Sequence, residues 1–188
     1  MKGQSLTPTL RTRFTAVKAV FMDVDGVLTD GSAIFIKGES PKVWHVRDRL
    51  GIKALISRGV KVFWISGRPS QELEERAREL GVHGAYHGVS DKFTLMKSLL
   101  SEAGLGSSEA LYIGDDLVDL RCMEYAGVGC APSDAVREVM DSADFVSDFP
   151  GGRGAVRQVA EVLLESLGLW EGVVEEYRTA GELRPRRK

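Results

Sequence analysis

Short apolar runs alternate with helical patterns along most of this chain, and this alternation constrains the fold more than any other feature. The runs that read as buried strands cover residues 19–22, 60–65, 85–86, 110–113, 128–131 and 143–146. Helical patterns lie at about residues 48–58, 70–81, 90–100 and 155–167. Strands that are separated by helices form parallel sheets with helices on both faces. The sequence therefore predicts an α/β fold with a Rossmann-like parallel sheet sandwiched by helices.

The composition is that of an ordinary soluble globular domain and excludes several other classes. The chain has 188 residues, of which 43% are hydrophobic and 28% are charged, and its net charge is -2. This balance gives no push toward nucleic acid or anionic membranes, and no run has the ~18 apolar residues that span a bilayer. Cys122 and Cys130 show no metal-ligand spacing and read as core residues in a reducing compartment. We expect no nucleic-acid or membrane partner and a cytoplasmic location.

The chain divides into three predicted parts. Residues 1–16 are polar, lack the apolar centre of a signal peptide and are expected to be flexible. Residues 17–170 form the predicted domain, and residues 171–188 form a tail with a basic end. Within the domain, Ser70 and Ser90 are expected to cap the helices that follow them, because a serine hydroxyl accepts hydrogen bonds from free N–H groups.

Two aspartates, Asp23 and Asp25, directly follow the first strand, and Gly26 permits a sharp exit from it. Ligands of open α/β sheets bind outside the carboxyl ends of the strands, where this pair lies. Two carboxylates so close repel each other unless a cation or a proton intervenes. A turn with solvated acids is one interpretation, and a site for a divalent metal with a phosphoryl group is the other.

Two further polar signals follow at later elements. Ser66, Gly67 and Arg68 come after the second strand, where a glycine lets the backbone approach an anion and a hydroxyl can bind it. Lys92 lies in the first turn of a helix, where the helix dipole disfavours a cation. A turn and a surface lysine are the ordinary interpretations, and a shared anion would explain both features.

Asp115, Asp116 and Asp119 follow the strand at 110–113 and repeat the repulsion of the first acid pair. One Mg²⁺ would relieve the repulsion in both groups. An acid pair, a hydroxyl, a lysine and a second acid group are what phosphoryl transfer through a carboxylate requires. The joint pattern therefore favours a phosphoryl-transfer enzyme.

In this order, the motifs resemble those of the haloacid dehalogenase superfamily of phosphohydrolases, over about residues 17–167. The resemblance implies that Asp23 is a nucleophile that forms an aspartyl-phosphate. Asp25 would be the general acid for the leaving group and then the base for water, which favours rapid hydrolysis of the intermediate. Ser66 and Lys92 would hold the phosphoryl oxygens.

The same resemblance implies a set of metal ligands. Asp23, the backbone carbonyl of Asp25 and Asp115 would bind Mg²⁺, with Asp116 and Asp119 as supports beside them. A phospho-receiver domain also combines acids with a lysine, but its lysine follows all the acids, whereas Lys92 precedes Asp115.

A projecting β-hairpin is predicted where two β-prone runs, 32–36 and 41–46, flank a turn that contains glycine. The intervals from Asp25 to Ser66 and from Ser66 to Lys92 are too short for a separate cap domain. A site without a cap is open to water unless another subunit covers it.

The cap-less arrangement is similar to the group of 3-deoxy-D-manno-octulosonate 8-phosphate phosphatases, which includes nonulosonate 9-phosphate phosphatases. The resembling stretches are residues 23–31, 46–48, 51–52, 66–68, 114–116 and 151–157. The resemblance implies a sugar-acid phosphate substrate, a homotetramer and a role in lipopolysaccharide biosynthesis. A nonulosonate 9-phosphate substrate and a non-catalytic oligomerisation domain of the same fold remain the alternatives.

Candidate residues for the sugar acid are Gly67 and three arginines, Arg47, Arg68 and Arg153. Arginine suits a carboxylate because its fork can bond both oxygens. A solvated helix entry and a surface turn are the ordinary interpretations of Arg47 and Arg153. His45 and Arg49 depart from the pattern of the group near the expected substrate entrance, so the chemistry is better specified than the substrate.

Overall fold

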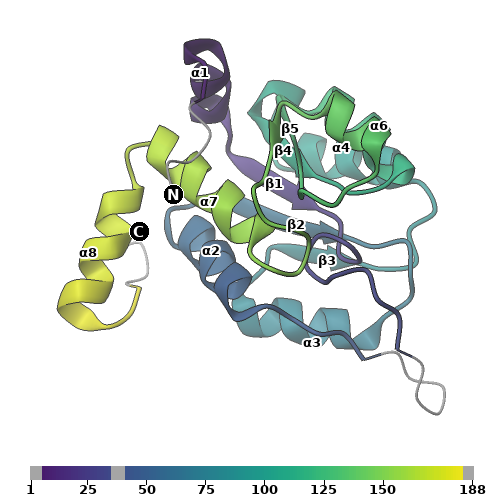
Figure 1. Cartoon of the computed structure of the whole chain (residues 1–188), viewed down its shortest axis with the longest axis horizontal. Coiled ribbons are helices and arrows are strands. Elements are labelled where there is room, and N and C mark those ends of the chain that lie inside the picture. Colours follow the sequence, from purple (N-terminus) through teal and green to yellow (C-terminus); the bar gives the residue numbers. More distant parts are fainter. Residues whose placement is uncertain (1–5, 35–40, 184–188) are drawn as a thin grey trace.

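A six-stranded parallel sheet forms the centre of the molecule, in the order β3-β2-β1-β4-β5-β6 (Figure 1). The computed structural model describes residues 6–34 and 41–183. The strands are β1 (Ala19–Met22), β2 (Lys61–Ile65), β3 (Gly84–Tyr86), β4 (Ala110–Ile113), β5 (Val128–Ala131) and β6 (Phe145–Val146). The predicted α/β class and parallel sheet are confirmed.

Helices cover both faces of this sheet (Figure 1). One face is covered by α1 (Pro8–Ala16), α2 (Val46–Ser57), α3 (Gln71–Leu80) and α7 (Ala155–Ser166). The other face is covered by α4 (Lys92–Glu102), α5 (Leu120–Tyr125) and α6 (Arg137–Ser142). The last helix, α8 (Trp170–Ala180), packs against α7. Short 3₁₀ turns lie at Ser107–Glu109 and Leu117–Asp119.

Each strand contributes to two apolar cores, because successive side chains of a strand point to opposite faces. On one face, Met22 and Trp64 pack with α2, α3 and α7. On the other, Phe21 stacks on Phe63 with ring centroids 4.9 Å apart, beneath α4. Burial on both faces explains why the strands read as continuous apolar runs.

The strand order places a crevice at the carboxyl ends of β1 and β4. From β1 the chain builds β2 and β3 on one side, and it then returns to build β4, β5 and β6 on the other. Such a switch point leaves the loops after the two central strands on opposite sides, with room for a ligand between them. Met22 of β1 is level with both Trp64 and Ile113, so the residues after these strands meet at one edge.

One of the two predicted helix caps is confirmed. The Ser70 hydroxyl accepts a 3.3 Å hydrogen bond from Leu73 N at the start of α3. The prediction for Ser90 was wrong, because Asp91 caps α4 and its Oδ1 accepts from Thr94 N at 3.0 Å. Aspartate is as good a cap as serine, and the helix begins one residue later than expected.

Both the N-terminal segment, which we expected to be flexible, and the C-terminal tail contain a helix. Within residues 1–16, α1 forms and buries Phe14, whose ring meets that of Phe145 edge-on at 6.2 Å. Arg13 pairs with Asp144 at 2.6 Å. Within residues 171–188, most of α8 forms, and Val173 is buried. The described parts of both segments therefore pack on the domain, and residues 1–5 and 184–188 lie outside the described residues.

The projecting β-hairpin is not seen in the described part of its segment. Residues 32–34 and 41–45 form no strand, and Val46 begins α2. The predicted turn falls on residues 35–40, which lie outside the described residues. Within the described ranges, no helix combines the length and the apolar character that crossing a membrane requires.

Candidate active site

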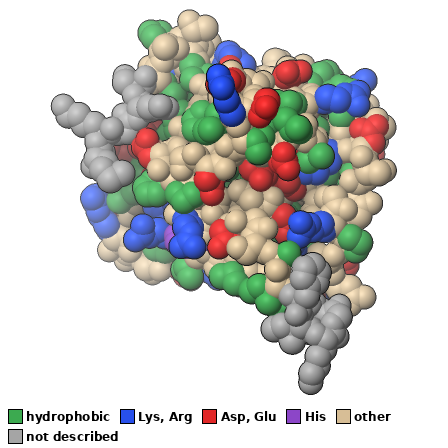
Figure 2. All heavy atoms as spheres, turned by 45° about the vertical axis from the view of Figure 1, so that its right-hand side comes forward, with side chains coloured by type: hydrophobic (Ala, Val, Ile, Leu, Met, Phe, Trp, Pro, Cys, Tyr) green, Lys and Arg blue, Asp and Glu red, His purple; other side chains and the backbone are tan. Residues whose placement is uncertain are grey.

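A cleft of about 570 Å³ lies at the carboxyl ends of β1 and β4 and gathers most of the predicted site residues. Those that line it are Asp23, Asp25, Gly67, Arg68, Lys92, Asp115 and Asp116. Figure 2 shows acidic side chains gathered near the middle of the face that it displays. A larger cleft of about 690 Å³ lies beside β3, but none of the predicted site residues lines it. The concentration of candidate groups therefore favours the smaller cleft.

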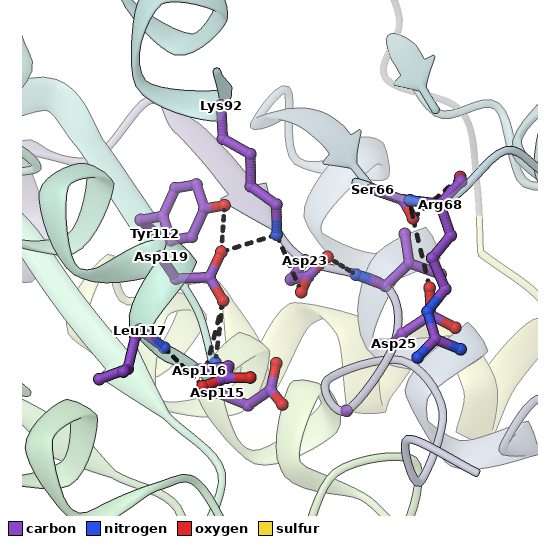
Figure 3. A network of polar contacts seen from close by, with 12 residues as sticks. Asp23, Asp25, Ser66, Arg68, Lys92, Tyr112, Asp115, Asp116, Leu117 and Asp119 are labelled. Carbon is purple, nitrogen blue, oxygen red and sulfur yellow. Dashed lines mark hydrogen bonds and ion pairs between the residues drawn. The ribbon is translucent and has the colours of Figure 1, made fainter. Parts of the chain in front are cut away.

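Lys92 joins two carboxylates at the floor of the cleft (Figure 3). Its Nζ lies 2.9 Å from Asp23 Oδ2 and donates to Asp119 Oδ1 at 2.8 Å. The other Asp23 oxygen accepts a 2.7 Å hydrogen bond from Val24 N. Lys92 is only 6% exposed, so its position in the first turn of α4 is explained by these buried carboxylates.

Asp119 connects Lys92 to the loop after β4 (Figure 3). Its Oδ1 also accepts from the Tyr112 hydroxyl at 2.9 Å, and its Oδ2 accepts from the Asp115 N–H at 3.2 Å. The side chain is fully buried. The Asp116 N–H also donates to Asp119 Oδ2, at 3.4 Å, while the Asp116 side chain caps the next turn, where its Oδ1 accepts from Leu117 N at 2.7 Å.

Asp25 lies on the opposite side of Asp23 from Lys92 (Figure 3). The Ser66 hydroxyl lies 3.2 Å from Asp25 Oδ2 and accepts from Arg68 N at 3.1 Å. The second Asp25 oxygen forms an ion pair with Lys42. Asp25 therefore has polar neighbours from two other parts of the chain, and neither is a neighbour of Asp23.

The acids around Asp23 fit a divalent metal ion. Carboxylate oxygens of Asp23, Asp115 and Asp119 all lie within 4.8 Å of one another. Asp115 Oδ1 is buried and has no hydrogen-bond partner in the described part of the chain. A buried carboxylate oxygen without a partner is costly, and hard cations such as Mg²⁺ take carboxylate ligands. Asp119 was expected only as a support, and its two oxygens already accept hydrogen bonds from the protein.

The electrostatics of the site point the same way. Burial, with the Asp119 carboxylate next, raises the pKa of Asp23 to about 6. Burial, with the Asp23 and Asp119 carboxylates next, raises the pKa of Asp115 to about 8. Burial alone would lower the pKa of Lys92, but Asp23 and Asp119 outweigh it and raise that pKa. A bound divalent cation would favour the ionised form of both acids and offset the repulsion between their carboxylates.

Gly26 makes the approach of Asp115 to the loop after β1 possible. Its φ is +98°, and a Cβ at this position would lie 2.0 Å from Asp115 Oδ2. Only glycine combines this backbone conformation with the required space. The sharp exit expected from the sequence is confirmed, and the close contact with the acid of β4 is an additional reason for the glycine.

Two predicted substrate residues do not reach the cleft of their own chain. Arg47 lines a separate cleft of about 300 Å³ beside Phe149 and Gly154, because the first turn of α2 faces α7. Arg153 lies 3.5 Å from Asp30 and its side chain is 66% exposed. Its loop is held against the loop after β1 by a 2.9 Å hydrogen bond from Gly152 N to Val27 O.

The residues that depart from the group pattern also lie away from the cleft. Arg49 pairs with Glu79 of α3 at 3.6 Å. His45 lies beside the buried Asp48, with Nδ1 3.5 Å from its Oδ2. Neither residue lines the cleft that contains Asp23. Their unusual identities therefore leave the chemistry of that cleft unchanged.

Sequence reasoning missed three residues of the site, namely Lys42, Tyr112 and Arg121. Tyr112 reads as one more apolar residue of β4, although its hydroxyl reaches Asp119. Arg121 lines the cleft from α5, a helix of only six residues whose pattern is too short to read. Lys42 falls in a segment that read as a hairpin strand, and no spacing signal connects it to Asp25.

The fold and the site together define a class of protein. An acid pair follows a central parallel strand, a lysine contacts the first acid, and a second acid group lies beside it. These groups suit phosphoryl transfer through a carboxylate. This combination is that of the haloacid dehalogenase-like phosphohydrolases. Residues 85–157 match the family model of haloacid dehalogenase-like hydrolases.

Comparison with individual proteins narrows the class. The chain is 36% identical over 165 residues to the 3-deoxy-D-manno-octulosonate 8-phosphate phosphatase KdsC of Salmonella typhimurium, and the match covers 87% of each chain. The protein belongs to the family of 3-deoxy-D-manno-octulosonate 8-phosphate phosphatases, within the haloacid dehalogenase superfamily.

Two solved structures of this family resemble the chain closely. The phosphatase of Moraxella catarrhalis, in complex with magnesium ion, phosphate ion and KDO, has a TM-score of 0.88 and 33% identity; 90% of this chain and 98% of that chain are covered. The cobalt-bound phosphatase of Haemophilus influenzae has a TM-score of 0.82 and 36% identity, with 90% and 97% covered.

Proposed function

We propose that the protein is a Mg²⁺-dependent phosphomonoesterase that hydrolyses a sugar-acid phosphate of the 3-deoxy-D-manno-octulosonate 8-phosphate type. The observation that carries this proposal is the group of Asp23, Lys92 and Asp115, in which the buried Oδ1 of Asp115 lacks a partner among the described residues. The substrate class is supported by the names of the relatives, and the metal by the magnesium ion in the Moraxella catarrhalis complex.

Asp23 is the nucleophile of the proposed reaction. One of its carboxylate oxygens attacks phosphorus, the bond from phosphorus to the sugar oxygen breaks, and an aspartyl-phosphate forms. Lys92 and Val24 N hold the carboxylate, at 2.9 and 2.7 Å. Asp25 donates a proton to the leaving sugar oxygen, so the sugar acid departs as a neutral alcohol at that position.

The second step returns the enzyme to its starting state. Asp25, now ionised, takes a proton from a water molecule that attacks the phosphorus of the aspartyl-phosphate. The bond between phosphorus and the Asp23 oxygen breaks, and inorganic phosphate leaves. Asp25 can serve in both steps because its carboxylate lies beside Asp23 and is partly exposed to the cleft, with its side chain 17% accessible.

Asp23, the backbone carbonyl of Asp25 and Asp115 hold Mg²⁺ in this proposal, with Asp116 and Asp119 as supports. When bound, the ion supplies positive charge to the phosphoryl oxygens. The Ser66 hydroxyl and the Gly67 N–H contact the same oxygens, and Arg68, which lines the cleft, binds the carboxylate of the sugar acid.

A homotetramer would complete the site in this proposal. No separate domain covers the cleft in the part of the chain that the structure describes. Apolar side chains are exposed beside the cleft and at the entrance to α2: Leu117, Val118, Val43 and Val46. Surfaces of this kind are typical of protein contacts. Arg47 and Arg153, which do not reach the cleft of their own chain, would approach that of a neighbour.

The proposed location is the cytoplasm, with a role in lipopolysaccharide biosynthesis. Cys122 and Cys130 are buried free thiols, which suits a reducing compartment. The pathway is what the resemblance to the 3-deoxy-D-manno-octulosonate 8-phosphate phosphatase group implies, so it depends on the substrate.

Phosphate release with Mg²⁺ from a panel of sugar phosphates tests the function. The panel contains 3-deoxy-D-manno-octulosonate 8-phosphate, a nonulosonate 9-phosphate and glucose 6-phosphate, and we expect the highest kcat/KM for the first. The Asp23→Asn variant keeps the shape of the side chain but removes the nucleophile, so kcat should fall by about 10⁴-fold or more. Preference for the nonulosonate would select the other sugar acid, and a turnover that Asp23→Asn leaves unchanged would contradict the mechanism.

A further inference from the structure

Lys42 makes an unexpected contact with the acid that we propose as the proton donor. Its Nζ forms an ion pair with Asp25 Oδ1, while Asp25 Oδ2 lies 3.2 Å from the Ser66 hydroxyl. The Lys42 side chain is only 8% exposed. Both oxygens of the Asp25 carboxylate are therefore held, one from each side.

Lys42 is itself held by the start of α3. Glu72 of that helix accepts two hydrogen bonds, from Lys42 N at 3.0 Å and from Trp44 Nε1 at 2.8 Å. The Trp44 ring stacks on Trp64 of β2, with centroids 5.5 Å apart. The backbone that carries Lys42 is thus held against α3 and β2. We call the two hydrogen bonds that Glu72 accepts the Glu72 clamp.

This arrangement differs from that of an ordinary surface lysine. Lys18, for comparison, pairs with Glu109 while its side chain is 65% exposed. Taking the Lys42 ammonium out of water has a cost, which its pairing with Asp25 offsets. A general acid must be held within hydrogen-bond reach of the oxygen that it protonates, and a small misplacement is enough to slow the reaction.

We propose that Lys42 is a positioning residue, which holds the Asp25 carboxylate in the orientation needed for proton transfer, while the Glu72 clamp holds Lys42. This inference rests on the proposed phosphatase function and extends it. Lys42 does not line the cleft, so it acts through Asp25 and not on the substrate. Its contribution should therefore depend on how much the reaction needs Asp25.

The leaving group separates this role from a general structural one. A sugar alkoxide needs a proton from Asp25 to depart, whereas p-nitrophenolate departs without one. In the Lys42→Met variant, the first turnover of p-nitrophenyl phosphate should therefore still give a rapid burst of about one p-nitrophenol per site. The later turnovers should be slow, because Asp25 also activates the water that cleaves the aspartyl-phosphate.

The experiment measures kcat and KM of the full chain with Mg²⁺, on the best sugar phosphate of the panel and on p-nitrophenyl phosphate. We expect Lys42→Met to lower kcat on the sugar phosphate by about 10²-fold, with KM changed little, and Lys42→Arg to restore part of it. In an Asp25→Ala background, Lys42→Met should have no further effect, since the residue through which it acts is gone. Lys18→Met is the matched control and should behave as wild type.

A second variant keeps the test decisive if Lys42→Met folds poorly. Trp44→Phe retains the stacking on Trp64 but removes the hydrogen bond to Glu72, and it should lower kcat in the same direction by less. Equal kcat in wild type, Lys42→Met and Trp44→Phe would overturn the inference. So would additive losses with Asp25→Ala, or a rise in KM alone, which would make Lys42 a substrate-binding residue. An inactive wild type would instead remove the proposed function itself.

Discussion

Asp23 and Asp25 are separated by one residue, yet the structure gives their carboxylates different neighbours. Asp23 contacts Lys92 and the backbone of Val24, whereas Asp25 contacts Ser66 and Lys42. The two aspartates follow a strand, where alternate residues would share a face, but the chain turns at Gly26 directly after them. The different neighbours suit different tasks, nucleophilic attack for the first acid and proton transfer for the second.

The Gly26→Ala substitution should disturb the metal site more than the fold. The new Cβ would lie 2.0 Å from Asp115 Oδ2, so Asp115 must move, and the φ of +98° adds backbone strain of about 1–3 kcal/mol. We expect the affinity for Mg²⁺, measured by isothermal titration calorimetry, to fall by about tenfold or more, which is about 1.4 kcal/mol.

A matched control for this substitution exists at the end of α3. Gly81 has a φ of +76°, and a Cβ there would meet nothing within 4 Å. Gly81→Ala should therefore reduce thermal stability through backbone strain alone and leave the affinity for Mg²⁺ unchanged. Equal losses of Mg²⁺ affinity in the two variants would contradict the role of Gly26.

The raised acid pKa values predict that the metal-free protein loses stability as the pH rises. Burial first, and then neighbouring carboxylates, raise the pKa of Asp115 from 3.8 to about 8 and that of Asp23 from 3.8 to about 6. An acid with a raised pKa in the folded state contributes stability below its unfolded pKa and loses it as the pH passes the folded value. The melting temperature in EDTA should therefore fall between about pH 4 and pH 8.

Whereas the melting temperature in EDTA should fall with pH, the stabilisation of the protein by Mg²⁺ should increase with pH. The ion binds ionised acids, so the rise in melting temperature that it causes should be larger at high pH than at low pH. Asp115→Asn removes one of the titrating groups and should flatten the pH dependence in EDTA. A melting temperature in EDTA that rises steadily over this pH range would contradict the assignment.

Among the secondary-structure elements, the sequence was most informative for helices whose apolar pattern runs over several turns and for strands that are buried on both faces. The buried strands β1, β4 and β5 and the amphipathic helices α3 and α7 lie where they were predicted. The short helices α5 and α6 were not predicted, because six residues give too little helical pattern. Helix α1 was missed since it buries only Phe14, so its pattern is almost wholly polar.

In the candidate site, the sequence likewise revealed some residues and not others. Asp23 and Asp115 were found because each follows a central strand, and the ends of parallel strands meet at one edge of the sheet. Lys92 was found because a cation is unusual in the first turn of a helix. Lys42 could not be found in this way. It reaches Asp25 from a segment without regular structure, through contacts with α3 that only the tertiary fold creates.

The Phe14→Ala substitution tests whether α1 belongs to the core. Phe14 is fully buried and packs edge-on against Phe145. Its removal should lower the free energy of unfolding by about 3–5 kcal/mol, measured by urea denaturation. Arg11→Ala, on an exposed position of the same helix, is the control and should change it by less than about 0.5 kcal/mol. A Phe14→Ala variant as stable as wild type would restore the interpretation of a flexible segment.

For the whole molecule, the proposed tetramer predicts a mass in solution four times that of the chain. Val43 and Val46 lie close together before and at the start of α2, 69% and 76% exposed, which suits a contact between subunits. Val46→Asp should weaken the assembly without harming α2, because an acid is favourable in the first turn of a helix. Light scattering over a range of concentrations measures the mass of the wild type and of the Val46→Asp variant. A wild type that is a monomer at every concentration would contradict the proposal.

The central place of β1 in the sheet has a consequence for the synthesis of the chain. β1 pairs with β2 on one side and with β4 on the other. β4 lies much later in the sequence, so Asp23 emerges from the ribosome long before Asp115. Until residues 110–113 have been made, one edge of an entirely apolar strand has no partner, and exposed edges of this kind favour aggregation. A ribosome that stalls between β2 and β4 would therefore release a chain that is both inactive and prone to aggregate.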